Sequence, residues 1–196
     1  MRFILIPLFV FFSFNLVSQS LQTLSRAEKI WTIQHPIAAL KIKMKLDYLK
    51  SVVEGIKFHP DLDTFSNGGK LDAFRHIYSM AYLSRKIKKR KLLKLGEAHE
   101  KGNYEFFISG KTEFGELPDS SSRIMDLHNN LIGIEIGFIQ DETILKNKVF
   151  EAIKSGKAKM ILKNKEGNYL DCDSQAIIQN MNLKKWNNRK CVIPTN

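Results

Sequence analysis

The sequence of 196 residues lacks the short motifs that would assign it directly to a well-understood enzyme class. It has no H-E-x-x-H motif and no G-x-S-x-G motif, which argues against a zincin-type metalloprotease and against a serine nucleophile. It also has no internal repeat and no low-complexity tract. With 43% hydrophobic and 26% charged residues, the composition is that of a globular protein rather than a disordered one. The length suits one domain with a hydrophobic core.

Cysteine is scarce, because the chain contains two, Cys172 and Cys191. Without histidines nearby, they do not form a zinc site. We expect them to form a disulfide in an oxidising compartment, which would stabilise the chain by roughly 3 kcal/mol. Two free thiols in a reducing compartment are the alternative.

Long hydrophobic runs are missing after residue 20, so no later segment has the roughly 20 apolar residues that a transmembrane helix needs. The first twenty residues, MRFILIPLFVFFSFNLVSQS, contain Arg2, then a mostly apolar run from Phe3 to Phe14, then polar and small residues. This pattern predicts a signal peptide over residues 1–20, cleaved near Ser20. We therefore expect an exported protein, periplasmic or secreted, with an uncleaved anchor as the alternative.

Acidic residues are few, since 20 Asp and Glu stand against 31 Lys and Arg, giving a formal charge of +11. A basic surface favours anionic partners, such as an anionic substrate or a membrane surface. No stripe of arginines and aromatics forms a specific nucleic-acid motif, and the oligomeric state stays open. The densest basic run, RKIKKRK at Arg85–Lys91, is expected at a helix end, where cations suit the negative end of the macrodipole. Contact with a membrane or polyanion is the alternative.

Hydrophobic residues at helical spacing predict a mainly α fold. We expect a helical bundle-like single domain over residues 21–196, with a small C-terminal β-hairpin. The predicted helices cover residues 21–33, 37–56, 70–86, 92–101, 122–137 and 142–154. Asp119 or a following serine should cap the fifth of these. Two strand-like segments, 158–164 and 168–173, flank the turn signal Lys165-Glu166-Gly167 and predict the hairpin.

Three of the predicted helices present polar side chains on a limited arc. Asp72 and His76 are four residues apart and share one helix face. The others are His99 and Glu100 on a second helix, and Asp126, Asn129 and Asn130 on a third. Gly133 and Gly137 continue the last face, and such small residues let a neighbouring helix come close. Helices packed at roughly 8–10 Å could bring these polar groups together.

The motifs around these residues, DAFRHIY, EAHE and MDLHNNLIGIEIG, resemble an uncharacterised bacterial helical domain family. The family occurs in exported proteins and at the C-terminal ends of toxin-like proteins, and the resemblance covers residues 68–162. Its characteristic positions are here Asp72, Arg75, His76, Ala98, His99, Glu100, Met125, Asp126, Leu127, Asn129, Asn130 and Gly133. One departure is Ser79, where relatives are expected to have an aromatic residue. The resemblance implies no activity.

A metal-dependent hydrolase acting on a phosphorylated or lipid substrate is the leading hypothesis. The order of His76, His99-Glu100 and Asp126 is similar to the H…H-D…D order of HD-type metal phosphohydrolases, although Glu100 replaces the usual Asp and the last Asp comes early. The expected ligands of zinc, manganese or iron are His76, His99 and Asp126, with Asp72 as a fourth ligand or a partner of His76. Glu100 would act as general base, while Arg75, Asn129 and Asn130 would hold the substrate. The hypothesis requires that His76, His99 and Asp126 converge.

Two other interpretations of the same residues stay open. The polar residues could form a structural network that fixes how the helices pack, because buried charges must be paired. Alternatively, the chain could be a non-catalytic module that binds an anionic surface through Arg85–Lys91 and the lysines of its tail. His99 and Glu100 differ in direction by roughly 100° around a helix, which weakens the hydrolase hypothesis.

Overall fold

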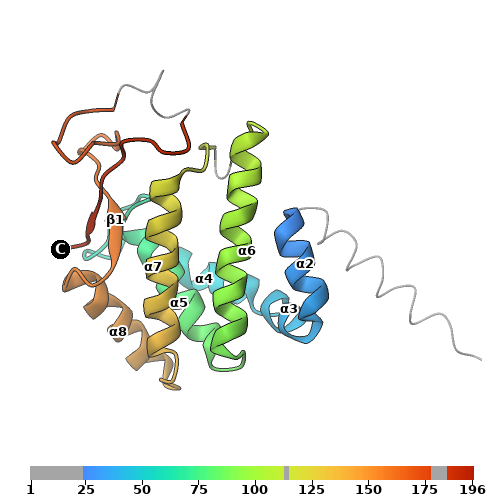
Figure 1. The fold of residues 1–196 in the computed structure, drawn as a ribbon. Helices are drawn as coiled ribbons and strands as arrows, with labels where there is room; N and C mark the ends of the chain where they lie inside the picture. Colours follow the sequence, from blue (N-terminus) through green and yellow to red (C-terminus); the bar gives the residue numbers. More distant parts are fainter. Residues whose placement is uncertain (1–23, 113–114, 178–184) are drawn as a thin grey trace, which may run out of the picture.

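The fold is built mainly of helices. The computed structural model describes residues 24–112, 115–177 and 185–196, and in these ranges it contains seven helices and one two-stranded antiparallel sheet (Figure 1). The elements are α2 (Arg26–Gln34), α3 (Pro36–Lys43), α4 (Leu46–Gly55), α5 (Lys70–Ser84), α6 (Lys89–Ile108), α7 (Ser120–Ile136), α8 (Glu142–Lys154), β1 (Lys159–Ile161) and β2 (Val192–Pro194). The predicted mainly α fold is confirmed. The predicted signal peptide and Ser20 lie outside the described residues. None of the described helices is long and apolar enough to cross a membrane.

Helices α5 and α7 pack against each other at very short range, and α6 lies beside α7 (Figure 1). A Cβ atom at Gly133 would collide with the backbone carbonyl of Ile77, and one at Gly137 would collide with Ser84. The predicted role of these two glycines in close helix approach is therefore confirmed. Helix α2 packs on α6, and α8 packs on α5.

The hydrophobic core lies between α5 and its neighbours. Its fully buried side chains include Phe74, Ile77, Tyr78, Leu92, Leu145, Val149 and Ile153. Because Phe74, Ile77 and Tyr78 recur at helical spacing, one face of α5 is entirely apolar. Asp72 and His76 lie off this face, which is how the helix can be both part of the core and part of a polar site.

Local capping signals set the starts of several helices. Ser25 and Glu28 form a reciprocal capping box at the start of α2. The carboxylate of Asp119 accepts a hydrogen bond of 2.8 Å from the backbone N–H of Ser122, so the predicted cap of α7 is confirmed.

Most predicted helices begin or end within a few residues of those in the structure, and two differ in a larger way. The segment predicted as one helix over residues 37–56 is interrupted at Met44 and Lys45, between α3 and α4. The helix predicted over residues 92–101 extends from Lys89 to Ile108 as α6.

The basic run Arg85–Lys91 spans two helix ends of opposite polarity. Arg85 lies at the C-terminal end of α5, where a cation is favoured. Lys89 begins α6, where the positive end of the helix disfavours cations. The macrodipole explanation is therefore right for the first residues of the run and wrong for the last.

The strand after α8 pairs with a partner other than the predicted one. β1 pairs antiparallel with β2, with Met160 opposite Ile193. Residues 168–173 take part in two isolated bridges instead: Tyr169 pairs with Lys163 across the predicted turn, and Leu170 pairs with Ala176.

Cys172 and Cys191 form the predicted disulfide in the structure. This bond fits an oxidising compartment. Export itself stays a prediction, because it depends on the N-terminal segment.

Candidate functional site

Three of the predicted site residues meet between α5 and α7. Asp72, His76 and Asp126 each offer one ligand atom, and these atoms all lie within 4.8 Å of one another. We call these three residues the polar cluster. Asp72 and Asp126 are buried, at 4% and 7% exposure, and the side chain of His76 is 12% exposed. The cluster is therefore almost entirely removed from bulk water.

Asn130 fixes the orientation of the His76 ring. The Nδ1 atom of His76 lies 3.1 Å from Oδ1 of Asn130, so the Nδ1–H group donates a hydrogen bond to the amide oxygen. The other ring nitrogen, Nε2, then lies 3.2 Å from Oδ1 of Asp126 and 3.4 Å from Oδ1 of Asp72. Gly96 on α6 leaves space for the amide of Asn130, since a Cβ atom there would lie 3.2 Å from its nitrogen.

Asp72 is held from two sides. Its Oδ2 atom accepts a hydrogen bond of 2.6 Å from the backbone N–H of Gly68, and its Oδ1 atom lies 2.5 Å from the guanidinium of Arg75. Arg75 is also 3.3 Å from Nε2 of His76. Burial acts to raise the pKa of Asp72, but the charge of Arg75 and the hydrogen bond with His76 lower it overall. Asp72 is therefore ionised at neutral pH.

The other two members of the cluster have raised pKa values. Burial acts to lower the pKa of His76, but the carboxylates of Asp126 and Asp72 raise it overall. Burial raises the pKa of Asp126 to about 8, with a further contribution from Asp72, although His76 opposes the shift. The His76–Asp126 pair thus holds a proton that offsets buried negative charge, and a cation that bound there would replace it.

Glu100 on α6 borders the cluster. Its side chain is fully buried, and its negative charge contributes to the raised pKa of Asp126. The amide of Asn103 lies 3.5 Å from one carboxylate oxygen of Glu100. Glu100 therefore lies close enough to Asp126 to act on the cluster electrostatically.

His99 does not join the cluster. Its Nδ1 atom lies 3.0 Å from Oε1 of Glu28 on α2. Helix geometry explains this, because adjacent residues point in directions about 100° apart and Glu100 takes the direction toward Asp126. The predicted convergence of His99 with His76 and Asp126 is therefore wrong.

Asn129 was expected to hold the substrate, but in the structure its side chain binds the backbone of β1. Its amide nitrogen donates to the carbonyl of Lys159, and its amide oxygen accepts from the N–H of the same residue, both at 2.9 Å. This pair of bonds fastens α7 to β1. We assign Asn129 to holding the strand rather than a substrate.

Asp63, which the sequence patterns did not identify, helps to position Asp72. The carboxylate of Asp63 accepts backbone hydrogen bonds from Lys70 at 2.7 Å and Leu71 at 3.2 Å, and so caps α5 from outside the helix. Gly69 makes this approach feasible, since a Cβ atom there would collide with Asp63. A cap at this separation leaves no local sequence signal.

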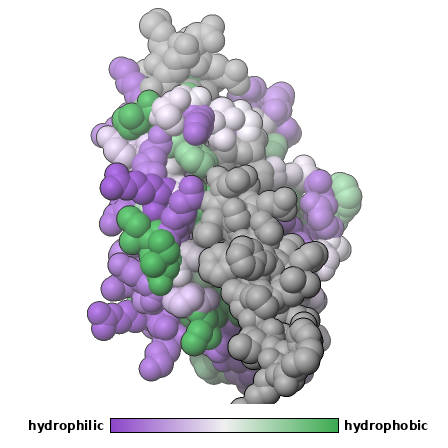
Figure 2. Space-filling view, turned by 90° about the vertical axis from the view of Figure 1, so that its right-hand side faces the viewer, coloured by the Kyte–Doolittle hydropathy of each residue, from purple (hydrophilic) through white to green (hydrophobic). Residues whose placement is uncertain are grey.

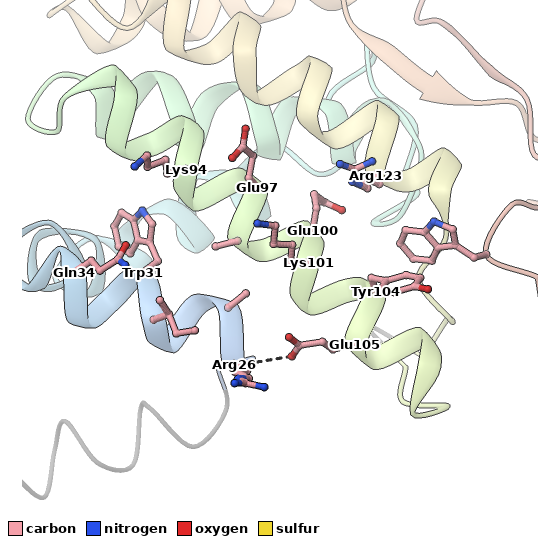
Figure 3. Close-up of a pocket in the computed structure, with 14 residues that line it drawn as sticks. Arg26, Trp31, Gln34, Lys94, Glu97, Glu100, Lys101, Tyr104, Glu105 and Arg123 are labelled. Atoms are coloured by element: carbon pink, nitrogen blue, oxygen red, sulfur yellow. Dashed lines mark hydrogen bonds between the residues drawn. The ribbon is translucent and has the colours of Figure 1, made fainter.

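A cavity of about 760 Å³ lies between α2 and α6, beside Trp186 (Figure 3). Its lining mixes basic, acidic and aromatic side chains: Arg26, Trp31, Gln34, Lys94, Glu97, Glu100, Lys101, Tyr104, Glu105, Arg123 and Trp186, with Ala27, Ile30 and Ala98. At its lower edge in Figure 3 the backbone N–H of Arg26 donates to Glu105 at 3.3 Å. Glu100 belongs both to this lining and to the surroundings of the cluster.

The model of a family described as a domain of unknown function, DUF6973, matches residues 29–159. No curated protein and no solved structure matches the chain. The match agrees with the resemblance to an uncharacterised domain family and extends it toward the N-terminus, over α2, α3 and α4. The family description names no activity, so a functional argument rests on the geometry of the site.

Proposed function

Since the chain belongs to the DUF6973 family of domains of unknown function, we infer its function from the geometry of the polar cluster. We propose a metal-dependent hydrolase in which Asp72, His76 and Asp126 hold a divalent cation. One observation carries the proposal: Oδ1 of Asp126 is buried without a hydrogen bond among the described residues, 3.2 Å from Nε2 of His76. A buried oxygen in that position is costly unless something else binds it.

The donor atoms suit a metal in spacing and in kind. Ligands bound to a metal at about 2.0–2.2 Å in tetrahedral geometry lie about 3.3–3.6 Å from one another. Nε2 of His76 lies 3.2 Å and 3.4 Å from the carboxylate oxygens of Asp126 and Asp72. Imidazole and carboxylate together suit zinc, manganese or iron. The bond from Nδ1 of His76 to Asn130 is the kind of support that orients a metal-binding histidine.

The remaining residues would act on the substrate. A bound cation would lower the pKa of a coordinated water and polarise a phosphoryl or carbonyl oxygen. Arg75 is more exposed than its partner Asp72, with 30% of its side chain accessible, and its guanidinium can bind an anionic oxygen. Glu100, buried near Asp126, is the candidate proton acceptor. With the basic surface, these groups favour a phosphorylated substrate, such as a phosphodiester or a phospholipid headgroup.

A structural network is the alternative. Arg75 and Asp72 form a contact of 2.5 Å, and one proton held between His76 and Asp126 would balance the remaining charge without a cation. In that case the cluster would fix α5 against α7 and would have no catalytic role.

Metal content separates the two proposals. We expect nearly one equivalent of zinc, manganese or iron in protein purified without chelator and without affinity histidines, measured by mass spectrometry. Asp126→Asn and His76→Gln should lose the metal, because each replaces a carboxylate or an imidazole with a neutral amide, which binds these metals much more weakly. With metal bound, phosphodiester and phospholipid hydrolysis should fall in the same two variants.

His99→Ala is the matched control, because His99 pairs with Glu28 outside the cluster. It should keep the metal. A wild-type protein that binds none of these metals after incubation with their salts would overturn the proposal and leave the structural network.

A further inference from the structure

Helix α3 is apolar on two opposite faces. Ala38 is buried against the core, with Ala39 and Ile42 packed beside it. The other face carries Ile37 and Leu40 and continues to Met44, the residue that caps the end of α3; these three are 58–72% exposed. We call these three residues the α3 face. They follow the spacing i, i+3, i+7, so they form one stripe along the helix.

An apolar helix face is normally covered, because leaving it in water forfeits the gain from burial. Ile33, in the last turn of α2 just before α3, is also 76% exposed. Figure 2 looks at the molecule from the α2 side and shows hydrophobic side chains scattered among hydrophilic ones around the grey atoms. The α3 face thus adds to a group of exposed large apolar side chains at one end of the molecule.

Basic residues surround this face. Between residues 29 and 46 the chain has four lysines, at 29, 41, 43 and 45, and no acidic residue. The amino group of Lys41 lies 3.3 Å from the carbonyl of Lys86, so α3 is next to the start of the basic run Arg85–Lys91. Lys86, Lys88 and Lys89 are exposed there. Figure 1 shows α3 and the connection between α5 and α6 together at the lower edge of the fold.

An exposed aromatic residue lies near the basic run. Phe138, in the connection between α7 and α8, is 78% exposed. The side chain of Arg85 donates to the carbonyl of Ile139 at 3.0 Å, which joins this connection to the end of α5. Exposed apolar residues and exposed lysines therefore occur together on α3 and on the connections after α5 and α7.

We propose that this end of the protein binds the surface of an anionic lipid membrane, with the α3 face inserted among the headgroups and the surrounding lysines on lipid phosphates. A helix that exposes apolar residues between lysines is typical of segments that lie in the membrane interface. Lysines close to such a surface are attracted by its negative potential. This proposal is independent of the metal site.

Charge favours a membrane over the other occupants. A second copy of the chain would bring Lys41, Lys43 and Lys45 against the same lysines of its partner in a two-fold contact, which is repulsive. A nucleic acid would use the lysines but would leave Ile37, Leu40 and Met44 in water. A lipid surface satisfies both the charges and the apolar side chains.

Vesicle flotation tests the proposal with residues 21–196, because the predicted signal peptide is apolar and would itself bind vesicles. We expect binding to vesicles of phosphatidylcholine with about one third phosphatidylglycerol, and little binding to pure phosphatidylcholine or at about 0.5 M salt. The variant Ile37→Ser/Leu40→Ser/Met44→Ser should bind more than about tenfold more weakly. The variant Lys41→Gln/Lys45→Gln/Lys88→Gln should bind the anionic vesicles roughly a hundredfold more weakly. All proteins begin at residue 21, so differences report on the α3 end.

Matched controls change the same kinds of residue elsewhere. Ile108→Ser/Ile124→Ser/Ile144→Ser removes three exposed apolar side chains, and Lys111→Gln/Lys165→Gln/Lys185→Gln removes three exposed charges. Both should bind as the wild type does, and circular dichroism should show the same helix content in every protein. Equal loss in test and control variants would overturn the proposal. So would a dimer that the α3 face variant dissociates, or binding to DNA that only the lysine variant weakens while vesicle binding is absent.

Discussion

His76 and His99 are both histidines on helices next to acidic residues, but their partners give them different roles. Nδ1 of His76 is held by Asn130, and Nε2 faces two carboxylates. Nδ1 of His99 instead lies 3.0 Å from Glu28, which also completes the capping box of α2. The arrangement around His76 points Nε2 toward the two carboxylates, where a cation could bind it. The arrangement around His99 fastens α2 to α6, so the stability of this contact should depend on the charge of Glu28.

We expect Glu28→Gln to lower the free energy of unfolding at neutral pH by about 1 kcal/mol. Burial acts to raise the pKa of Glu28, but hydrogen bonds with His99 and Ser25 lower it overall. Because the folded-state pKa lies below the unfolded value near 4.5, the carboxylate stabilises the fold above that value. This stabilisation is lost as the pH falls through the folded-state pKa.

Denaturant unfolding at several pH values between about 3 and 7 measures the effect. The difference between wild type and Glu28→Gln should be largest at neutral pH and should close in acid. The control is Glu97→Gln, because Glu97 is an exposed residue of α6. This variant should have the same free energy of unfolding as the wild type at every pH. A difference that stays constant with pH would argue against an ionised Glu28 in the contact.

At the scale of elements, the close approach of α5 and α7 creates the polar cluster. Asp72 and His76 come from α5, and Asp126 comes from α7. Gly133 lies seven residues after Asp126, two turns along the same face of α7. A side chain at this position would push against the backbone of α5 at Ile77, which cannot move aside as a flexible side chain could.

We therefore expect Gly133→Ala to lower the free energy of unfolding by about 1–3 kcal/mol, measured by urea denaturation. Gly55→Ala is the matched control, because a Cβ atom at Gly55, the last residue of α4, meets nothing within 4 Å. It should leave stability unchanged or raise it by up to about 1 kcal/mol, since alanine favours helix. Similar changes in the free energy of unfolding of both variants would show that α5 and α7 can move apart to accommodate the added methyl group.

Sequence patterns predicted the elements that depend on neighbours within about four residues. The helices and the Asp119 cap belong to this class. Gly133 and Gly137 indicated a close helix approach, but not that α5 is the helix that approaches. The cap of α5 by Asp63, the pairing of β1 with β2 and the contact of His99 with Glu28 join residues that are further apart. Periodicity places a side chain on a face of its own helix, but it does not say which neighbour that face meets. For this reason the polar cluster was predicted in part, with His99 wrongly included.

At the scale of the whole molecule, the C-terminal segment braces the helices that carry the cluster. Asn129 holds β1, which pairs with β2, and Thr195 donates a hydrogen bond of 2.6 Å to the carbonyl of Ile153 on α8. The backbone of Cys191 bonds to Leu162 and Leu170 in the same region. The disulfide between Cys172 and Cys191 therefore closes a segment that is fastened to α7 and α8, and removing it should affect global stability.

We expect Cys172→Ser/Cys191→Ser to lower the free energy of unfolding by about 3 kcal/mol, because the disulfide restricts the unfolded chain over a separation of 19 residues. Denaturant unfolding of the variant, of the oxidised wild type and of the reduced wild type measures this. The reduced wild type should match the variant, since each lacks the same bond. Amide exchange should rise first at β1 and β2 and last in α5, because the strands depend on the tail while the core of α5 does not. Equal stability of oxidised and reduced wild type would mean that the helices hold the tail without the disulfide.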